Sequence, residues 1–287
     1  MKPDRRFLDQ PGHFWANVRS ISQHVGYTAR GTRQIRVPDL RTIVQALSEM
    51  ELGAGHVVDA YGNPTALGAS LIAYFAHRAD ILNRTVEPSL MDASQAAKTF
   101  AHVRMATKSK LPVPMNKQKG TKKKPAYLTA IVNMLIDANI EGLPCDYDPR
   151  ELTTFTEGGA PLRTLARRID GAFPSAVNPI AVWEIKEYYH TTTFGSRVAD
   201  GVYETLLDGM ELQELRRSER VECRHYLMVD AHYTWWDCGR SYLCRIVDML
   251  HMGYVDEVLF GTEVLERLPV LAQDWAKLYA ERDAEAR

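Results

Sequence analysis

Hydrophobic side chains in the first hundred residues recur at intervals of three and four, the period of amphipathic helices. Pro38-Asp39 and Asn63-Pro64-Thr65 supply residue types that favour helix starts. The pattern predicts a small helical domain over residues 1–105. The recurring positions are Phe14, Val18, Ile21, Val25, Leu40, Ile43, Val44, Leu47, Leu67, Leu71, Ile72, Phe75 and Ile81.

The pattern changes beyond residue 125, where short apolar runs alternate with longer helical periods. Strands that alternate with helices of this length predict an α/β domain over 126–287, with a mixed central sheet flanked by helices. The expected elements are a helix at 126–140, an irregular segment at 143–160, a short helix or strand at 162–168, a strand at 179–189, a helix from about 198 to 215, a strand at 226–230, a helix at 241–252, a strand at 257–260 and a helix from about 264.

Residues 106–125 separate the two expected domains and favour a mobile linker or surface loop. Seven lysines lie between 108 and 124, together with Pro112, Pro114 and Gly120 and hardly any large apolar residue. Lysine runs of this kind bind phosphates without reading sequence, although a merely soluble linker has the same composition. The candidate phosphate contacts are Lys117, Lys119, Lys122, Lys123 and Lys124.

The net charge of −1 hides a strong segregation along the chain. Residues 1–125 hold 19 lysines and arginines against 9 acidic residues, whereas the rest of the chain holds 16 against 27. A basic part can bind a polyanion while an acidic part supplies carboxylates for a metal, and two ordinary domains with different surfaces are the alternative.

Residues 26–37, between the first helices, are rich in hydrogen-bond donors. Arg30, Arg33, Gln34 and Arg36 are long enough to reach phosphates or base edges of a nucleic acid. A solvated loop with some strand character explains the same residues equally well.

The strongest chemical signal lies in the strand at 179–189. A strand alternates its side chains, so Glu184 and Lys186 lie on one face while Trp183 and Ile185 lie on the other. Charges in a half-buried sheet need partners or a metal. With Asp170 as a third member, the carboxylates of Asp170 and Glu184 and the backbone carbonyl of Ile185 form an oxygen ligand set that suits Mg²⁺.

Such a metal supports hydrolysis of a phosphodiester, with Lys186 close to the attacking water. The structural alternative is a cross-strand pair of Glu184 and Lys186 on the surface of an amphipathic strand. In that case Asp170 only caps a turn.

Ile169-Asp170-Gly171 followed by Ile180-Ala-Val-Trp-Glu184-Ile185-Lys186 resembles the catalytic signature of the PD-(D/E)xK nucleases, which include most type II restriction endonucleases. The resemblance covers about residues 126–287, and the chain departs from the family in having Ile169 where proline is usual. It implies a restriction-endonuclease-like core in which Asp170 and Glu184 hold Mg²⁺ and Lys186 acts at the water. Mn²⁺ is expected to substitute for Mg²⁺.

Many family members carry a further glutamate on the helix before the first strand. Glu141 and Glu157 are possible counterparts, and Glu204 on the following helix could equally face the site. The polar segment after the strand could bind backbone oxygens of the substrate, although Ser196 could instead only cap a helix. Its candidate contacts are Tyr189, His190, Thr192, Ser196 and Arg197.

These observations together predict a Mg²⁺-dependent endonuclease of restriction type that cleaves double-stranded DNA in defence against foreign DNA. A homodimer is expected, because a symmetric site cut on both strands requires two active sites. A repair or recombination nuclease of the same chemistry, and a DNA-binding protein without activity, are the alternatives. The N-terminal segment does not have the apolar core of a signal peptide, so we expect a cytoplasmic protein that does not interact with membranes.

Overall fold

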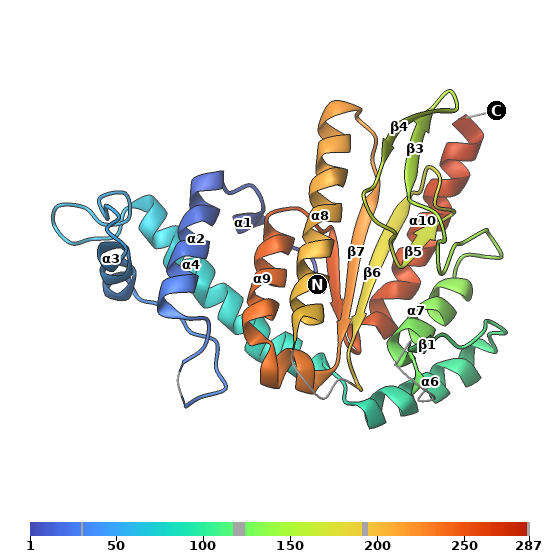
Figure 1. Ribbon diagram of the computed structural model, residues 1–287, viewed down its shortest axis with the longest axis horizontal. Helices are drawn as coiled ribbons and strands as arrows, with labels where there is room; N and C mark the ends of the chain where they lie inside the picture. Colours follow the sequence, from blue (N-terminus) through green and yellow to red (C-terminus); the bar gives the residue numbers. More distant parts are fainter. Residues whose placement is uncertain (30, 117–123, 191–194, 286–287) are drawn as a thin grey trace. The chain divides into compact units, whose positions relative to one another are not determined.

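The computed structural model describes residues 1–29, 31–116, 124–190 and 195–285. It has a mixed α/β architecture, as the sequence pattern predicted, and it divides into two compact units that we describe separately (Figure 1). The helical unit comprises Pro3–Pro88 and Trp235–Gly253. The sheet unit comprises Met1–Lys2, Ser89–Thr234 and Tyr254–Arg287.

The helical unit contains helices at Gly12–Val25, Leu40–Glu49 and Ala66–Ile81, where the three-and-four spacing predicted them. The carboxylate of Asp39 accepts a hydrogen bond from the Thr42 amide at 2.8 Å, which satisfies a free donor at the start of α3. Phe14, Leu71 and Tyr74 lie in its fully buried core. The elements are α1 (Arg5–Leu8), α2 (Gly12–Val25), α3 (Leu40–Glu49), α4 (Ala66–Ile81), the π-helical turn η1 (Leu82–Val86), part of a second π-helical turn η2 (Tyr233–Cys238), and α9 (Arg240–His251).

The boundaries of the units differ from a division at residues 105 and 125. Helix α6 (Ala93–Thr107) belongs to the sheet unit, because its Val103 packs into the same core cluster as α7 (Tyr127–Asp137). Helix α9 belongs to the helical unit, because its Asp248 pairs with the buried Arg78 at 3.0 Å. Both assignments depend on long-range contacts that the local sequence pattern does not contain.

The sheet unit has a central mixed sheet in the order β5-β6-β7-β8. Strand β5 pairs antiparallel with β6, whereas β6, β7 and β8 are mutually parallel. Helix α8 forms the crossover from β6 to β7, as parallel strands require. The bounds are Gly171–Phe173 for β5, Ala181–Glu187 for β6, Ser196–Ser218 for α8, Arg224–Asp230 for β7 and Glu257–Phe260 for β8.

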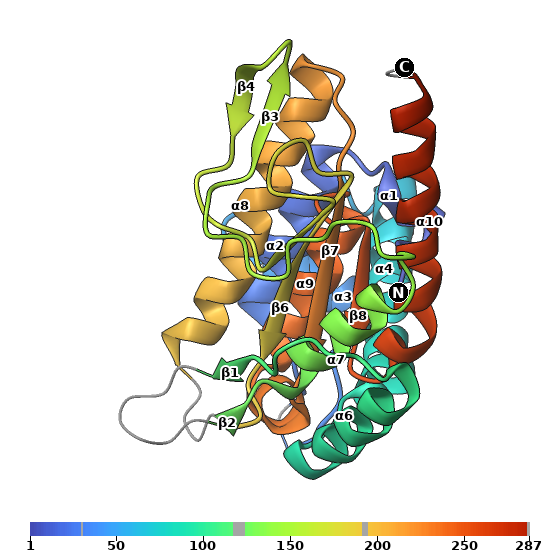
Figure 2. The same cartoon turned by 90° about the vertical axis from the view of Figure 1, so that its right-hand side faces the viewer.

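Helices cover both faces of this sheet (Figure 2). On one face, Trp183 of β6 packs in a cluster with residues of α7 and of α10 (Glu263–Glu285), and its ring stacks on Trp275 at a centroid distance of 5.5 Å. On the other face, Val182 packs with Leu212 and Leu215 of α8. The alternation along β6 therefore directs Glu184 and Lys186 toward the α8 side.

Two short hairpins complete the described part of the sheet unit, and one of them corrects an expectation. Strands β3 (Thr154–Glu157) and β4 (Ala160–Thr164) pair across Gly158 and Gly159, so the segment 143–160 is not wholly irregular. Its strand was hard to recognise because Phe155 is the one buried residue among four. Within the expected linker, β1 (Met115–Asn116) pairs with β2 (Lys124–Pro125), and residues 117–123 lie outside the described residues.

Gly171 determines how closely β5 approaches β6 beside Asp170. A Cβ atom at this position would lie 2.2 Å from the Trp183 indole, which is fully buried and cannot move aside easily. We expect Gly171→Ala to lower the free energy of unfolding by about 1–3 kcal/mol, as overpacking of a core does. Urea denaturation measures this effect, with Gly55→Ala as the control because no atom lies within 4 Å of that position. Equal losses in both variants would contradict the prediction.

Candidate functional site

Asp170, Glu184 and Lys186 lie together in the sheet unit. Because Gly171 pairs with Trp183, Asp170 lies beside Glu184 at the start of β5. The Asp170 amide donates a hydrogen bond to Glu184 Oε1 at 3.2 Å, and the Ile185 amide donates to Asp170 Oδ2 at 2.8 Å. Lys186 Nζ donates to Glu184 Oε2 at 2.6 Å. The hairpin thus brings the two predicted carboxylates and the lysine into one group.

Glu184 and Lys186 are buried and do not form a pair on a strand surface, whereas Asp170 is half-buried. Glu184 is 0% exposed and Lys186 is 7% exposed. Helix α8 covers them, and Gly201 allows its close approach, since a Cβ atom there would lie 3.1 Å from Lys186 Cδ and 2.9 Å from the Tyr188 hydroxyl. The surface-pair alternative is therefore wrong for Glu184 and Lys186.

Two further residues that sequence reasoning missed belong to the same group. Arg167 NH1 contacts Glu184 Oε1 at 2.9 Å and Asp208 Oδ2 at 2.6 Å. Glu204 Oε2 lies 3.3 Å from Lys186 Nζ and 3.4 Å from Arg167 NH2. We call the whole set the carboxylate cluster; its members are Arg167, Asp170, Glu184, Lys186, Glu204 and Asp208.

The charges of the cluster perturb one another. Burial raises the pKa of Asp170 to about 6, and the nearby charge of Glu184 adds to the effect. Burial also disfavours ionised Glu184, but the cations Lys186 and Arg167 outweigh it and lower the pKa of Glu184. Burial likewise opposes the charge on Lys186, yet Glu184 and Asp170 raise the pKa of this lysine. Lys186 is therefore a cation paired with an ionised Glu184.

Asp208 is a second fully buried acid of the cluster. Its side chain is 0% exposed, and its Oδ1 atom is buried without a hydrogen-bond partner among the described residues. Burial, followed by the charge of Glu184, raises the pKa of Asp208 to about 7. Because its other oxygen contacts Arg167, Asp208 holds the Arg167 guanidinium beside Glu184.

Of the three auxiliary glutamates considered from the sequence, Glu204 joins the cluster. Glu141 follows α7 in a turn with a φ of +53°, and Glu157 ends β3; both are exposed. No hydrogen bond or ion pair between described residues links either of them to the cluster. The choice of Glu204 depends on α8 crossing over β6, which the sequence alone did not reveal.

The predicted phosphate contacts after β6 have different environments. The Tyr189 hydroxyl donates to Asp230 Oδ2 at 2.5 Å, so it is already engaged within the fold. Burial, with the charge of Lys124, lowers the pKa of His190, and His190 Nε2 has no partner among the described residues. Arg197 and Lys124 are exposed. Ser196 begins α8, while Lys117, Lys119, Lys122, Lys123 and Thr192 lie outside the described residues.

Asp230 is a buried acid outside the cluster, and its raised pKa predicts how stability depends on pH. Burial raises its pKa to about 7, above the value near 4 of an unfolded chain, so the folded state binds more protons between about pH 4 and 7. Its contribution to stability therefore decreases as the pH rises through this window. Asn does not titrate, so Asp230→Asn lacks this pH dependence. We expect the free energy of unfolding of the variant, relative to that of the unsubstituted protein, to be higher at pH 8 than at pH 4.5 by at least about 1 kcal/mol. Urea unfolding at the two pH values measures this difference, and a pH-independent difference would contradict it.

In the helical unit, the donor-rich loop 26–37 has strand character. Thr28 and Ile35 form an antiparallel bridge. Arg33 and Gln34 are exposed, although Arg33 also pairs with Asp237 at 3.3 Å, and Arg36 is half-buried. Arg30 lies outside the described residues.

Arg33 and Gln34 line a groove together with residues of α4 and η1, among them Asn83 and Arg84, which sequence reasoning missed. The groove has a volume of about 560 Å³. Its wall includes the π-helical turn η1, and such turns are frequent at functional sites. Two predicted contacts and two additional donors thus lie on one surface of the helical unit.

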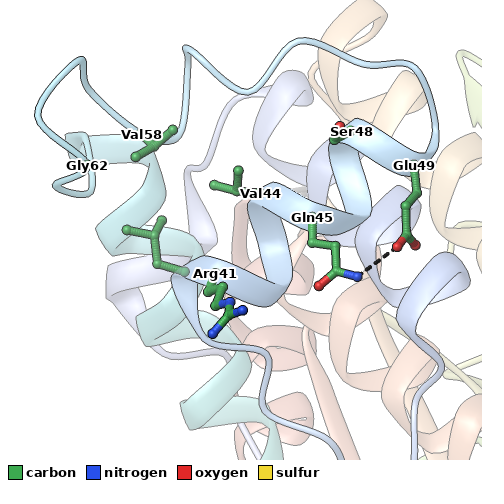
Figure 3. Close-up of a pocket in the computed structure, with 8 residues that line it drawn as sticks. Arg41, Val44, Gln45, Ser48, Glu49, Val58 and Gly62 are labelled. Carbon is green, nitrogen blue, oxygen red and sulfur yellow. Dashed lines mark hydrogen bonds between the residues drawn. The ribbon is translucent and has the colours of Figure 1, made fainter.

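A second groove of the helical unit follows the outward face of α3 and has a volume of about 600 Å³ (Figure 3). Among the described residues that line it, Arg41 is the one cation, and Gln45 donates a hydrogen bond to Glu49 at 2.8 Å. Val44 and Val58 are among its apolar lining residues. It contains no cluster of groups suited to catalysis.

The donor set at the cluster fits a hard cation with few protein ligands. Asp170 and Glu184 supply adjacent carboxylates, and Mg²⁺ is commonly held by one or two carboxylates while it keeps several waters. The described residues contain no group of three or more His, Cys, Asp or Glu side chains arranged to hold a metal.

A family model described as a domain of unknown function, DUF7687, matches residues 91–275. The chain belongs to the DUF7687 family. The DUF7687 match contains the whole carboxylate cluster, and a second model, described as the domain of unknown function DUF7690, matches residues 1–85. The two matches meet near Pro88–Ser89, which is one of the boundaries between the units, and the DUF7687 match also includes Trp235–Gly253 of the helical unit. No curated protein and no solved structure matches this DUF7687 chain.

The described helices include none that is both long enough and apolar enough to cross a bilayer. The four cysteines of this DUF7687 protein are unpaired, and Cys223 and Cys244 are buried. The cytoplasmic location remains a prediction.

Proposed function

We propose that this protein is a Mg²⁺-dependent endonuclease that hydrolyses phosphodiester bonds of double-stranded DNA, with a restriction role against foreign DNA. The observation that carries the proposal is the convergence of the half-buried Asp170 with the buried Glu184 and Lys186 at the β5–β6 hairpin. Burying a carboxylate and a lysine beside a second, half-buried carboxylate is costly, and such perturbed groups gather at functional sites more often than elsewhere.

The order of the elements around the cluster supports the same proposal. Asp170 precedes β5, Glu184 and Lys186 lie on its antiparallel neighbour β6, and α8 leads to the parallel strand β7. A PD-(D/E)xK core requires its signature residues on such a hairpin, followed by a helix and a parallel strand. The fold of this region is therefore compatible with a restriction-endonuclease-like core.

Asp170 and Glu184, with the carbonyl of Ile185, would hold Mg²⁺, which when bound activates water and neutralises charge that develops on the phosphate. Without a metal, Glu184 is paired with Lys186 and Arg167. Binding of Mg²⁺ would therefore replace part of these contacts. Lys186 would orient the attacking water and stabilise its deprotonated form. Arg167, retained by Asp208, keeps a positive charge beside the phosphate.

The helical unit would contribute the DNA contacts that select the target. Arg33, Gln34, Asn83 and Arg84 line one groove and carry donors that suit phosphates and base edges. Lys124 and Arg197 of the sheet unit are exposed and would bind phosphates near the cleavage point. A homodimer on symmetric DNA is part of this proposal.

The competing function is DNA binding without catalysis. One observation favours it: Glu184 already has two cationic partners, Arg167 and Lys186, as expected of a structural ion-pair network. In that case the cluster would only stabilise the fold, and the basic surfaces would do all the binding.

Incubation with supercoiled plasmid distinguishes the two functions. The proposal expects nicked and linear products in Mg²⁺ or Mn²⁺ and no products in EDTA. It also expects modified and unmodified plasmids to be cleaved to different extents, which would show the target preference. Linear duplexes, flaps and junctions separate a restriction activity from a repair or recombination activity. Binding of all these substrates without cleavage of any of them would establish the non-catalytic alternative.

A further inference from the structure

Exposed side chains of α8 follow a strict alternation of three and four residues along its outward face. The apolar members are large and open to solvent: Tyr203 is 51% exposed, Leu207 43% and Met210 51%. This spacing is the seam of a two-helix coiled coil. The full seam consists of Asp200, Tyr203, Leu207, Met210, Glu214 and Arg217, which we call the α8 seam.

The opposite face of the same helix already packs on the sheet. Val202, Leu212 and Leu215 are buried there. Single exposed apolar residues are normal on a protein surface, but three aligned over two turns form a continuous stripe. Among the described residues, no hydrogen bond or ion pair occupies the side chains of Asp200 or Arg217, and Glu214 contacts Arg163 at 3.2 Å.

The order of charges along the α8 seam specifies one self-complementary register. If a second α8 lies antiparallel, with a two-fold axis between Asp208 and Gly209, Asp200 of one copy faces Arg217 of the other. In the same register, Tyr203 faces Glu214 and Leu207 faces Met210. A parallel pair would instead oppose Asp200 to Asp200 and Arg217 to Arg217, which is unfavourable. Each of the three pairings occurs twice, as a two-fold contact requires.

We propose that the α8 seam binds a second copy of this chain, with α8 packed antiparallel against α8. The contact does not depend on the nuclease proposal. The seam extends over 18 residues, about 27 Å of helix, which is small beside a standard interface. The dimer is therefore concentration-dependent and dissociates in the micromolar range.

Charge reversal tests the register. Sedimentation velocity of the full chain between about 1 and 100 µM should show dimers that both Asp200→Arg and Arg217→Asp weaken at least about tenfold in Kd. An equimolar mixture of the two single variants should form heterodimers in native mass spectrometry, because each repulsive pair becomes attractive. The double variant Asp200→Arg/Arg217→Asp should recover self-association.

Leu207→Glu tests the apolar centre and should abolish the dimer. Leu278→Glu is the matched control, since Leu278 is an exposed leucine of α10 with an exposed fraction of 39%. Circular dichroism verifies that every variant folds. A monomer at all concentrations overturns the proposal, and so does a dimer that survives Leu207→Glu or fails to respond to the charge reversals.

Discussion

Glu184→Gln should reduce DNA cleavage by about 10²–10⁴-fold while the protein remains folded. The substitution keeps the shape of the side chain but removes the charge that would hold the metal, and a bound metal contributes several kcal/mol to such reactions. It also removes the ionic partner of Lys186 and Arg167, which contact Glu184 at 2.6 and 2.9 Å. The initial rate of plasmid nicking under saturating Mg²⁺ measures the effect.

Glu257→Gln is the matched control for this experiment. Glu257 is also a buried glutamate on a strand of the same sheet, and it pairs with an arginine, since Arg267 Nε lies 2.8 Å from its Oε1 atom. Its loss should change the nicking rate by less than about threefold, which corresponds to less than 1 kcal/mol. Equal losses of activity in the two variants would indicate that the Glu184 effect comes from stability alone.

Asp248→Ala should lower the free energy of unfolding of the helical unit by about 3–5 kcal/mol. The substitution leaves Arg78, which is 1% exposed, as an uncompensated buried charge. Asp248 accepts hydrogen bonds from Arg78 NH1 at 3.0 Å and from the Tyr74 hydroxyl at 2.6 Å, so two buried donors lose their acceptor. Chemical denaturation followed by circular dichroism measures this loss.

Two comparisons isolate the cause of the Asp248 effect. Asp80→Ala removes an acid from an exposed pair with Arg84, also at 3.0 Å and also on this unit, and should cost no more than about 0.5 kcal/mol. The double variant Arg78→Met/Asp248→Leu should recover much of the lost stability, because neither charge then remains buried alone. A small Asp248→Ala effect, similar to that of Asp80→Ala, would contradict the prediction.

The predictions from sequence succeeded where a local pattern determines the geometry. The alternation along β6 placed Glu184 and Lys186 on one face, and the helical spacing identified α2, α3 and α4. The element order from β6 to α10 was also recovered, apart from η2, whereas β5 at Gly171–Phe173 follows the short helix or strand expected at 162–168. These features depend on the two- and 3.6-residue periods, which can be recognised in the sequence without tertiary information.

What the sequence did not reveal depends on which elements meet in space. Arg167 enters the cluster only because the chain after β4 brings it under α8, and no local pattern indicates this position. Asp208 had a signal that could have been used: it lies four residues after Glu204, on the buried face of α8, where an acid requires a partner. The membership of α9 in the helical unit likewise depends on the ion pair between Arg78 and Asp248.

The central claim is that Asp170 and Glu184 hold a divalent ion beside Lys186. Crystals soaked in Mn²⁺ test it directly, because the ion is located by its anomalous scattering. The account predicts a peak within about 2.0–2.4 Å of a carboxylate oxygen of both residues. Glu184→Gln should abolish this peak and Glu257→Gln should retain it. Mn²⁺ bound only elsewhere, or no peak at the two carboxylates, would contradict the account.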